Sequence, residues 1–117
     1  MKAKNGIWLK DENEINVNFI NAKKLNKNYV EDVSITVFNK NFELLKNIEA
    51  KKADITDFTW KIYDVKIFEK NKPKKESDHI LLRTNFDYKR LNSLFSNLFS
   101  VSIWNLFSFQ NDPNLIN

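Results

Sequence analysis

Residues 33–41 read Val-Ser-Ile-Thr-Val-Phe-Asn-Lys-Asn, and this stretch decides the fold class of the chain. Apolar side chains stand at every second position, at Val33, Ile35 and Val37, which is typical of a half-buried β-strand. The residues between them are Ser and Thr, and β-branched residues suit a pleated surface. Residues 39–41 then read Asn-Lys-Asn, and Asn tolerates the left-handed backbone of tight turns. We therefore expect a hairpin here and an antiparallel sheet around it.

Similar strand-like runs lie before and after this segment, about eight to twelve residues apart and separated by polar, turn-rich clusters. They cover residues 7–9, 15–20, 42–50, 53–55, 58–63, 65–68 and 79–86. The apolar positions change parity near Lys51 and Lys52, and again between Ile62 and Val65, so we expect a bulge or kink at both places. No convincing amphipathic helix lies among these runs. They predict an all-β fold, an open β-jellyroll or sandwich of short antiparallel strands with a short C-terminal helical segment.

The end of the chain has a different pattern. The polar stretch over residues 69–78, EKNKPKKESD, is expected to form an exposed hairpin loop. Residues 91–109 carry no charge, and their apolar side chains recur at spacings of three and four, which indicates an amphipathic helix with Ser102 as a suitable N-cap. We therefore predict a β-jellyroll domain over residues 1–90 and a C-terminal amphipathic segment over residues 91–117.

The composition excludes several classes of site. The 117 residues suffice for one domain with one core, and 14% aromatic residues argue against disorder. The chain has no Cys, one His and one Gly, which excludes disulfides, zinc-thiolate and poly-His sites, and Gly-rich phosphate loops. The net charge of +4 is modest for a dedicated nucleic-acid binder. No apolar stretch reaches the length of about 18 residues that spans a bilayer.

No set of residues has the spacing of a catalytic site. Asp54, Asp57 and Asp64 are close in sequence, but a glycosidase needs two carboxyl groups at a set separation in a cleft, and surface turns explain these residues better. Histidine often acts as a general base, yet His79 begins a strand beside a charged loop, where a solvated side chain is the simpler interpretation. We therefore predict a protein that is not an enzyme and that binds no metal and no cofactor.

Two other functions remain open at this point. The basic residues Lys70, Lys72, Lys74 and Lys75 suit phosphate groups of a nucleic acid, a lipid headgroup or a membrane surface, although a solvated hairpin tip explains them as well. A free-standing β-barrel that binds single-stranded nucleic acid through lysines and aromatic residues is therefore an alternative function. A small carbohydrate-active enzyme that uses two of the aspartates is a third hypothesis.

Several short motifs follow one another over nearly the whole chain. They are GIWLKD at 6–11, VSITVF at 33–38 after Leu25, LLKNIEAKKA at 44–53, WKIYDV at 60–65 and FSVSIWNL at 99–106. Their order resembles the periplasmic domain of the lipopolysaccharide export permeases, the LptF/LptG (YjgP/YjgQ) family, and is closer to the LptG side. The loop over residues 70–78 matches no motif of that family. The flanking transmembrane helices of the family have no counterpart here, so the resemblance implies a domain excised from a larger protein.

The resemblance implies a non-catalytic periplasmic domain of an ABC-type lipopolysaccharide exporter at the inner membrane. Such a domain shelters lipid acyl chains and docks the periplasmic bridge. The implied partners are lipopolysaccharide, other jellyroll proteins of the bridge, the second permease subunit and a cytoplasmic ATPase, with no nucleic acid. Unpaired edge strands would join the next jellyroll by strand addition.

The candidate lipid-binding residues are the apolar side chains expected on the inner face: Trp8, Phe19, Val33, Ile35, Val37, Leu44, Ile48, Trp60, Ile62 and Leu82. Each methylene buried against such a face is worth about 0.8 kcal/mol. At every one of these positions, plain core packing is the alternative explanation. Lys72, Lys74 and Lys75 are the candidates for contact with a headgroup or another anion.

Overall fold

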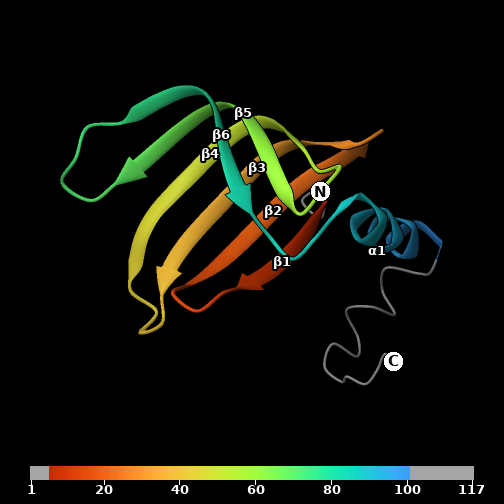
Figure 1. Ribbon diagram of the computed structural model, residues 1–117, viewed down its shortest axis with the longest axis horizontal. Helices are drawn as coiled ribbons and strands as arrows, with labels where there is room; N and C mark the ends of the chain where they lie inside the picture. The colour runs from red at the N-terminus through yellow and green to blue at the C-terminus, as the bar shows by residue number, and fades with distance from the viewer. Residues whose placement is uncertain (1–5, 101–117) are drawn as a thin grey trace.

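Six antiparallel strands and one helix make up residues 6–100, the part of the chain that the computed structural model describes (Figure 1). The elements are β1 (Ile7–Glu12), β2 (Asn16–Asn26), β3 (Tyr29–Asn39), β4 (Leu44–Asp54), β5 (Thr59–Glu69), β6 (Lys75–Arg83) and α1 (Tyr88–Ser100). Each strand pairs with its neighbours in the sequence, so the strands form one open sheet in the order β1-β2-β3-β4-β5-β6. The predicted all-β class with a short C-terminal helix is confirmed.

Asparagine side chains organise the β1–β2 and β3–β4 turns in this glycine-poor chain. Asn13 Oδ1 accepts hydrogen bonds from the backbone N–H groups two and three residues further on, at 2.8 Å each. Asn39 Oδ1 accepts from the backbone N–H groups of Asn41 and Glu43 at 2.9 and 3.0 Å. Such side-chain bonds replace the backbone bonds of an ordinary turn. The turn predicted after the segment that decides the fold is confirmed.

A crease crosses the sheet where the alternation of inward and outward side chains reverses. Asp32 and Asp64 have left-handed backbones there, with φ of 54° and 56°, a conformation that Asp tolerates better than most residues. The bulge or kink predicted near Lys51 and between Ile62 and Val65 takes the form of a reversal in the burial pattern, with no shift in the register between β4 and β5. One residue of each strand from β2 to β6 has no partner in the register at the crease: Lys23, Asp32, Lys51, Asp64 and Asp78.

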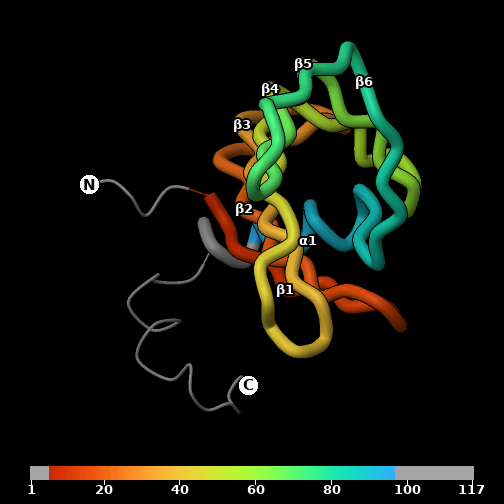
Figure 2. Tube along the Cα trace, turned by 90° about the vertical axis from the view of Figure 1, so that its left-hand side faces the viewer, coloured from red at the N-terminus to blue at the C-terminus, as the bar shows by residue number. Residues whose placement is uncertain are grey.

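The sheet curls around its inner face, and the segment after β6 reaches across to β1 (Figures 1 and 2). The backbone N–H and the Nδ2 of Asn85 donate hydrogen bonds to Asp11 Oδ1 at 3.2 and 2.7 Å. The same Nδ2 donates to the carbonyl of Glu12 at 3.3 Å. Because β1 and β6 are the two edges of the sheet, these bonds connect its edges at one place.

The core lies between the inner face of the sheet and α1. Leu91 and Phe95 of the helix are buried in the same apolar cluster as the strand residues. Trp60 is fully buried in this cluster, and its indole N–H donates to the carbonyl of Phe86 at 2.7 Å. Because Phe86 lies just before α1, this bond ties the start of the helix to β5.

Two element boundaries differ from the prediction. Residues 75–78 belong to β6, so the loop is shorter than the one expected over residues 69–78. The start of this edge strand has polar side chains, so the sequence there lacks the apolar–polar alternation that predicts a strand. The helix begins at Tyr88, before the expected start at Leu91. The boundary predicted between residues 90 and 91 therefore falls inside α1. The N-cap predicted at Ser102 lies outside the described residues.

Candidate functional site

Most of the residues predicted for the inner face lie there. Buried members of the core cluster are Val33, Ile35, Val37, Ile48, Trp60 and Ile62. Leu82 packs against the same cluster and is half-buried. These side chains pack against one another and lie in the same cluster as α1, so the inner face is covered in this structure.

Trp8, Phe19 and Leu44 lie on the outer face instead. Trp8 stands between two buried neighbours on β1, so the strand alternation turns it outward and leaves it 71% exposed. Phe19 precedes the buried Ile20 on β2 and is turned outward for the same reason. Leu44 lies beyond a register shift, where it pairs with the outward-facing Phe38 and is 60% exposed. A shift of one residue moves a side chain to the opposite face.

The inner face is apolar along most of its length and becomes polar toward the β1–β2 turn. One register row is aliphatic from β1 to β5 and ends at Lys75 on β6; its aliphatic members are Leu9, Ile20, Ile35, Ile48 and Ile67. The next row toward the turn begins with Asp11 and Asn18, which are buried. Asn18 Oδ1 has no hydrogen-bond partner among the described residues, and a buried acceptor of this kind calls for water or a ligand donor.

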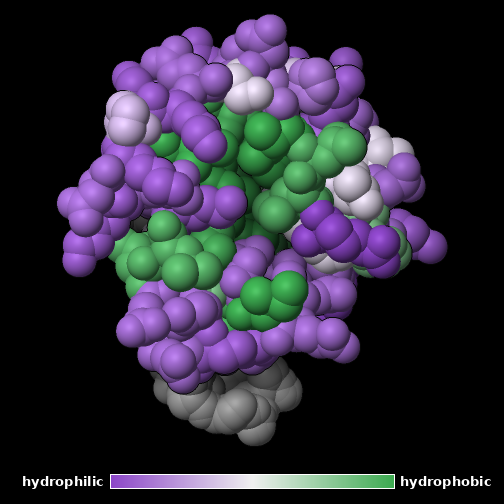
Figure 3. Space-filling model, turned by 60° about the vertical axis from the view of Figure 1, so that its left-hand side comes forward, coloured by the Kyte–Doolittle hydropathy of each residue, from purple (hydrophilic) through white to green (hydrophobic). Residues whose placement is uncertain are grey.

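Large apolar side chains also reach the surface. Figure 3 shows apolar side chains gathered around a hollow in the middle of one face, with hydrophilic residues around them. Patches of this kind on a soluble surface often mark contacts with lipids or proteins. Within residues 6–96, the exposed large hydrophobic residues are Trp8, Ile15, Phe42, Leu44, Leu45, Phe58, Phe68 and Leu81.

An aromatic cluster on the outer face was not anticipated from the sequence. Phe19 and Phe38 meet edge to face with ring centroids 5.7 Å apart, and Phe42 lies 6.5 Å from Phe38. Val17 is buried although it lies outside the core cluster, and it pairs with Phe38 in the register. The alternating pattern of β2 and β3 also places apolar residues on the outer face. The sequence analysis assigned only an inner apolar face, and it placed Phe19 there.

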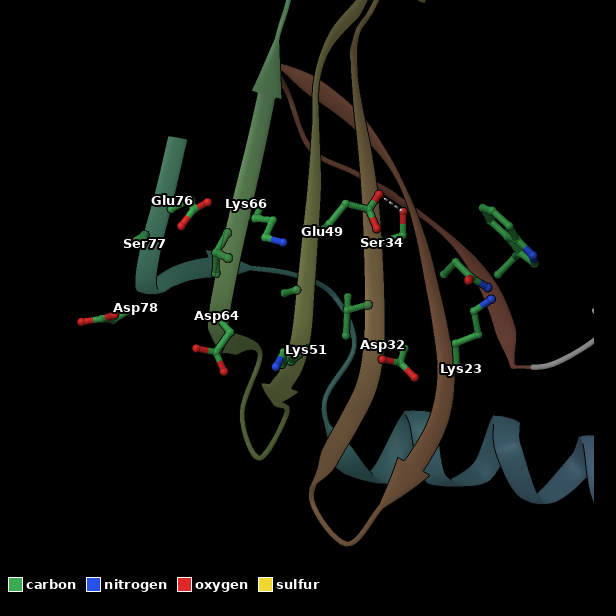
Figure 4. Close-up of a pocket in the computed structure, with 15 residues that line it drawn as sticks. Lys23, Asp32, Ser34, Glu49, Lys51, Asp64, Lys66, Glu76, Ser77 and Asp78 are labelled. Atoms are coloured by element: carbon green, nitrogen blue, oxygen red, sulfur yellow. Dashed lines mark hydrogen bonds between the residues drawn. The ribbon is translucent and has the colours of Figure 1, made fainter. Parts of the chain in front are cut away.

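A polar groove of about 910 Å³ runs across the outer face along the crease (Figure 4). Its lining reaches from Trp8 on β1 to Asp78 on β6 and carries both lysines and carboxylates. Ser34 Oγ donates to Glu49 Oε2 within it at 2.8 Å. This mixed charge suits neither an acyl chain nor a polyanion, because each requires a surface of one kind.

The acidic candidates do not form a catalytic pair. Asp54 sits at the end of β4, where its Oδ1 accepts hydrogen bonds from Thr56 Oγ1, the Thr56 N–H and Asn28 Nδ2 at 2.6, 3.0 and 3.2 Å. Burial opposes ionisation of Asp54, but these hydrogen bonds and the charge of Lys61 together outweigh it, so the pKa of Asp54 is lowered. Asp64 lies in the crease, and Asp57 is exposed in the turn before β5. Among the described residues, no cluster of acidic and His side chains is suited to a metal.

The remaining polar candidates lie on the surface. His79 is exposed, with its ring 6.4 Å from that of Tyr63. Lys72 lies 4.0 Å from a carboxylate oxygen of Glu69, and Lys74 lies 3.1 Å from one of Glu76. Exposed ion pairs of this kind contribute little to stability. Lys72, Lys74 and Lys75 remain solvent-accessible around the β5–β6 turn.

A sequence model of the family described as lipopolysaccharide export system permease LptF/LptG matches residues 2–115. The match covers the whole described sheet and α1, and it does not distinguish LptG from LptF. No curated protein matches the chain. Nothing in these comparisons supports nucleic-acid binding. In residues 6–100, no helix is both long and apolar enough to cross a membrane.

Proposed function

Since this chain belongs to the LptF/LptG family of lipopolysaccharide export permeases, we propose that it is the periplasmic domain of such a permease and shelters lipid acyl chains on the inner face of its sheet. Members of this family are inner-membrane permeases and form part of a transporter, not a catalytic enzyme family. The family match is the observation that carries the proposal. The curled, apolar sheet supports its finer part.

The chemistry of the inner face suits a hydrocarbon chain. The aliphatic row from Leu9 to Ile67 crosses five strands without a charged side chain. A saturated chain lying against this row gains about 0.8 kcal/mol for each methylene that leaves water. Asn18 and Asp11 lie at the polar end of the inner face. Their side-chain oxygens would accept hydrogen bonds from N–H or O–H groups near the place where the acyl chain joins the headgroup. The headgroup itself would remain in water.

The edge strands support the docking part of the proposal. On its outward side each of β1 and β6 lacks a strand partner among the described residues. Unpaired strand edges accept a strand from another protein. We propose that such an edge docks jellyroll proteins of a periplasmic bridge, and that the domain acts with a second permease subunit and a cytoplasmic ATPase. Lys72, Lys74 and Lys75 are proposed contacts for anionic headgroups.

Two neighbouring residues on β5 provide a matched test. Ile67 faces the core and is partly buried, whereas Phe68 faces outward and is 42% exposed. We expect the 117-residue chain to bind lipopolysaccharide but not its de-acylated form in a surface plasmon resonance assay. Ile67→Gln should weaken this binding about tenfold, and Phe68→Gln should leave it within about twofold, since a buried polar group opposes apolar contact. Equal binding of the acylated and de-acylated forms would contradict the proposal.

A further inference from the structure

Residues 85–100 form a strap that connects the two open edges of the sheet. The strap leaves β6, contacts the end of β1 through Asn85, and continues into α1. Its helix places Leu91 and Phe95 in the core, while Asn92, Ser93 and Ser96 are exposed. The strap therefore covers an apolar face with an amphipathic segment, as a lid does.

The strap is attached differently from the strands beneath it. Strands β2 to β5 are hydrogen-bonded to neighbours on both sides through their backbones. The strap is held by a few hydrogen bonds that each involve a side chain, and by the apolar residues of α1. These bonds run from the N–H and Nδ2 of Asn85 to Asp11, from the same Nδ2 to the carbonyl of Glu12, and from the Trp60 N–H to the carbonyl of Phe86. Segments with few backbone bonds to the rest of the fold open at lower free energy than central strands.

We propose that the strap is a displaceable cover, whose apolar residues occupy the place of a lipid acyl chain until the contact between Asp11 and Asn85 opens. This inference rests on the proposed function, because it assigns a regulator to the same inner face. Leu91 and Phe95 present the same kind of surface as a hydrocarbon chain, so a chain that enters between β1 and β6 replaces their contacts. The buried state of Val37, Ile48 and Trp60 then describes the closed form of the site.

The absence of Cys from the chain makes a direct test possible. In Asp11→Cys/Asn85→Cys, a short bifunctional thiosulfonate reagent would hold the strap on β1, and a thiol reductant would release it. The probe is cis-parinaric acid, a fatty acid whose fluorescence rises in an apolar site. We expect the cross-linked protein to bind it at least about tenfold more weakly than the same protein after reduction, since only the open fraction binds. The single-Cys variants, treated in the same way, serve as controls.

A second variant weakens the contact without any cross-link. Asn85→Ala deletes the side-chain hydrogen bonds to the Asp11 carboxylate and to the Glu12 carbonyl, and it keeps the backbone N–H bond to Asp11. The inner face is unchanged, so we expect the probe to associate about tenfold faster. Equal binding before and after reduction, with the cross-link verified by mass, would overturn the strap while the proposed function stands. If the probe associates with Asn85→Ala at the wild-type rate, that result would also contradict the role of the strap as a cover. If neither the wild type nor Asn85→Ala binds the probe, the proposed function fails, and the strap has nothing to regulate.

Discussion

Replacement of Trp60 by Phe tests whether the inner face is packed as described. Trp60 is 0% exposed, and its indole N–H donates to the carbonyl of Phe86 at 2.7 Å. Thr84 Oγ1 donates to the same carbonyl at 3.0 Å, so the substitution does not leave that oxygen without a partner. The variant loses a hydrogen bond worth about 1 kcal/mol. It also loses buried ring area and leaves a small cavity, so the total loss is about 2–3 kcal/mol.

Trp8 provides the matched control, because it is the same residue type on the opposite face. It is 71% exposed, and Trp8→Phe should change the free energy of unfolding by less than about 0.5 kcal/mol. Urea denaturation of both variants, followed by far-UV circular dichroism, measures the two differences under identical conditions. A loss below about 1 kcal/mol in Trp60→Phe, or equal losses in both variants, would refute the assignment of the two faces.

Two further predictions concern the aspartates. Asp64→Val should lower the free energy of unfolding by about 1–2 kcal/mol, because a β-branched residue fits poorly at its φ of 56°. Asp64→Asn should be nearly neutral, and thermal or urea denaturation that ranks the two variants equally would contradict the left-handed crease. The lowered pKa of Asp54 predicts stability that is present at neutral pH and is lost as the pH falls below the usual Asp value of 3.8. Over that acidic range the free energy of unfolding should fall more steeply with pH in the wild type than in Asp54→Asn. If the two proteins lose stability in parallel, the hydrogen bonds of the Asp54 carboxylate do not favour its charged form.

Local patterns were sufficient to predict much of the sheet. Val33, Ile35 and Val37 alternate because one face of β3 is buried, and burial leaves a period of two in the sequence. The reversals at Lys51 and Asp64 were visible for the same reason, since each one changes the parity of the apolar residues around it. Turns were readable because, in a chain with one glycine, asparagine and aspartate are the other residues that tolerate the backbone of tight turns.

The features that were missed depend on information that no local pattern contains. Ile7, Trp8 and Leu9 form a continuous apolar run, so the sequence does not say which of them faces outward. Leu44 changed face because of a register shift opposite β3, which depends on the pairing of two strands. The bond between Asp11 and Asn85 joins residues 74 positions apart, and only the curl of the sheet brings them together.

The most direct test of the account is to locate a bound acyl chain on the sheet. In the 117-residue chain labelled with ¹³C and mixed with unlabelled lipid A, isotope-filtered nuclear Overhauser spectra report contacts between the lipid methylenes and protein methyl groups. We predict contacts to the inner-face methyls of Val37, Ile48 and Ile67 and none to those of Leu44 and Leu81, which are 60% and 66% exposed. Contacts confined to Leu44 and Leu81 would show that lipid binds the outer surface and would contradict the proposed role of the inner face.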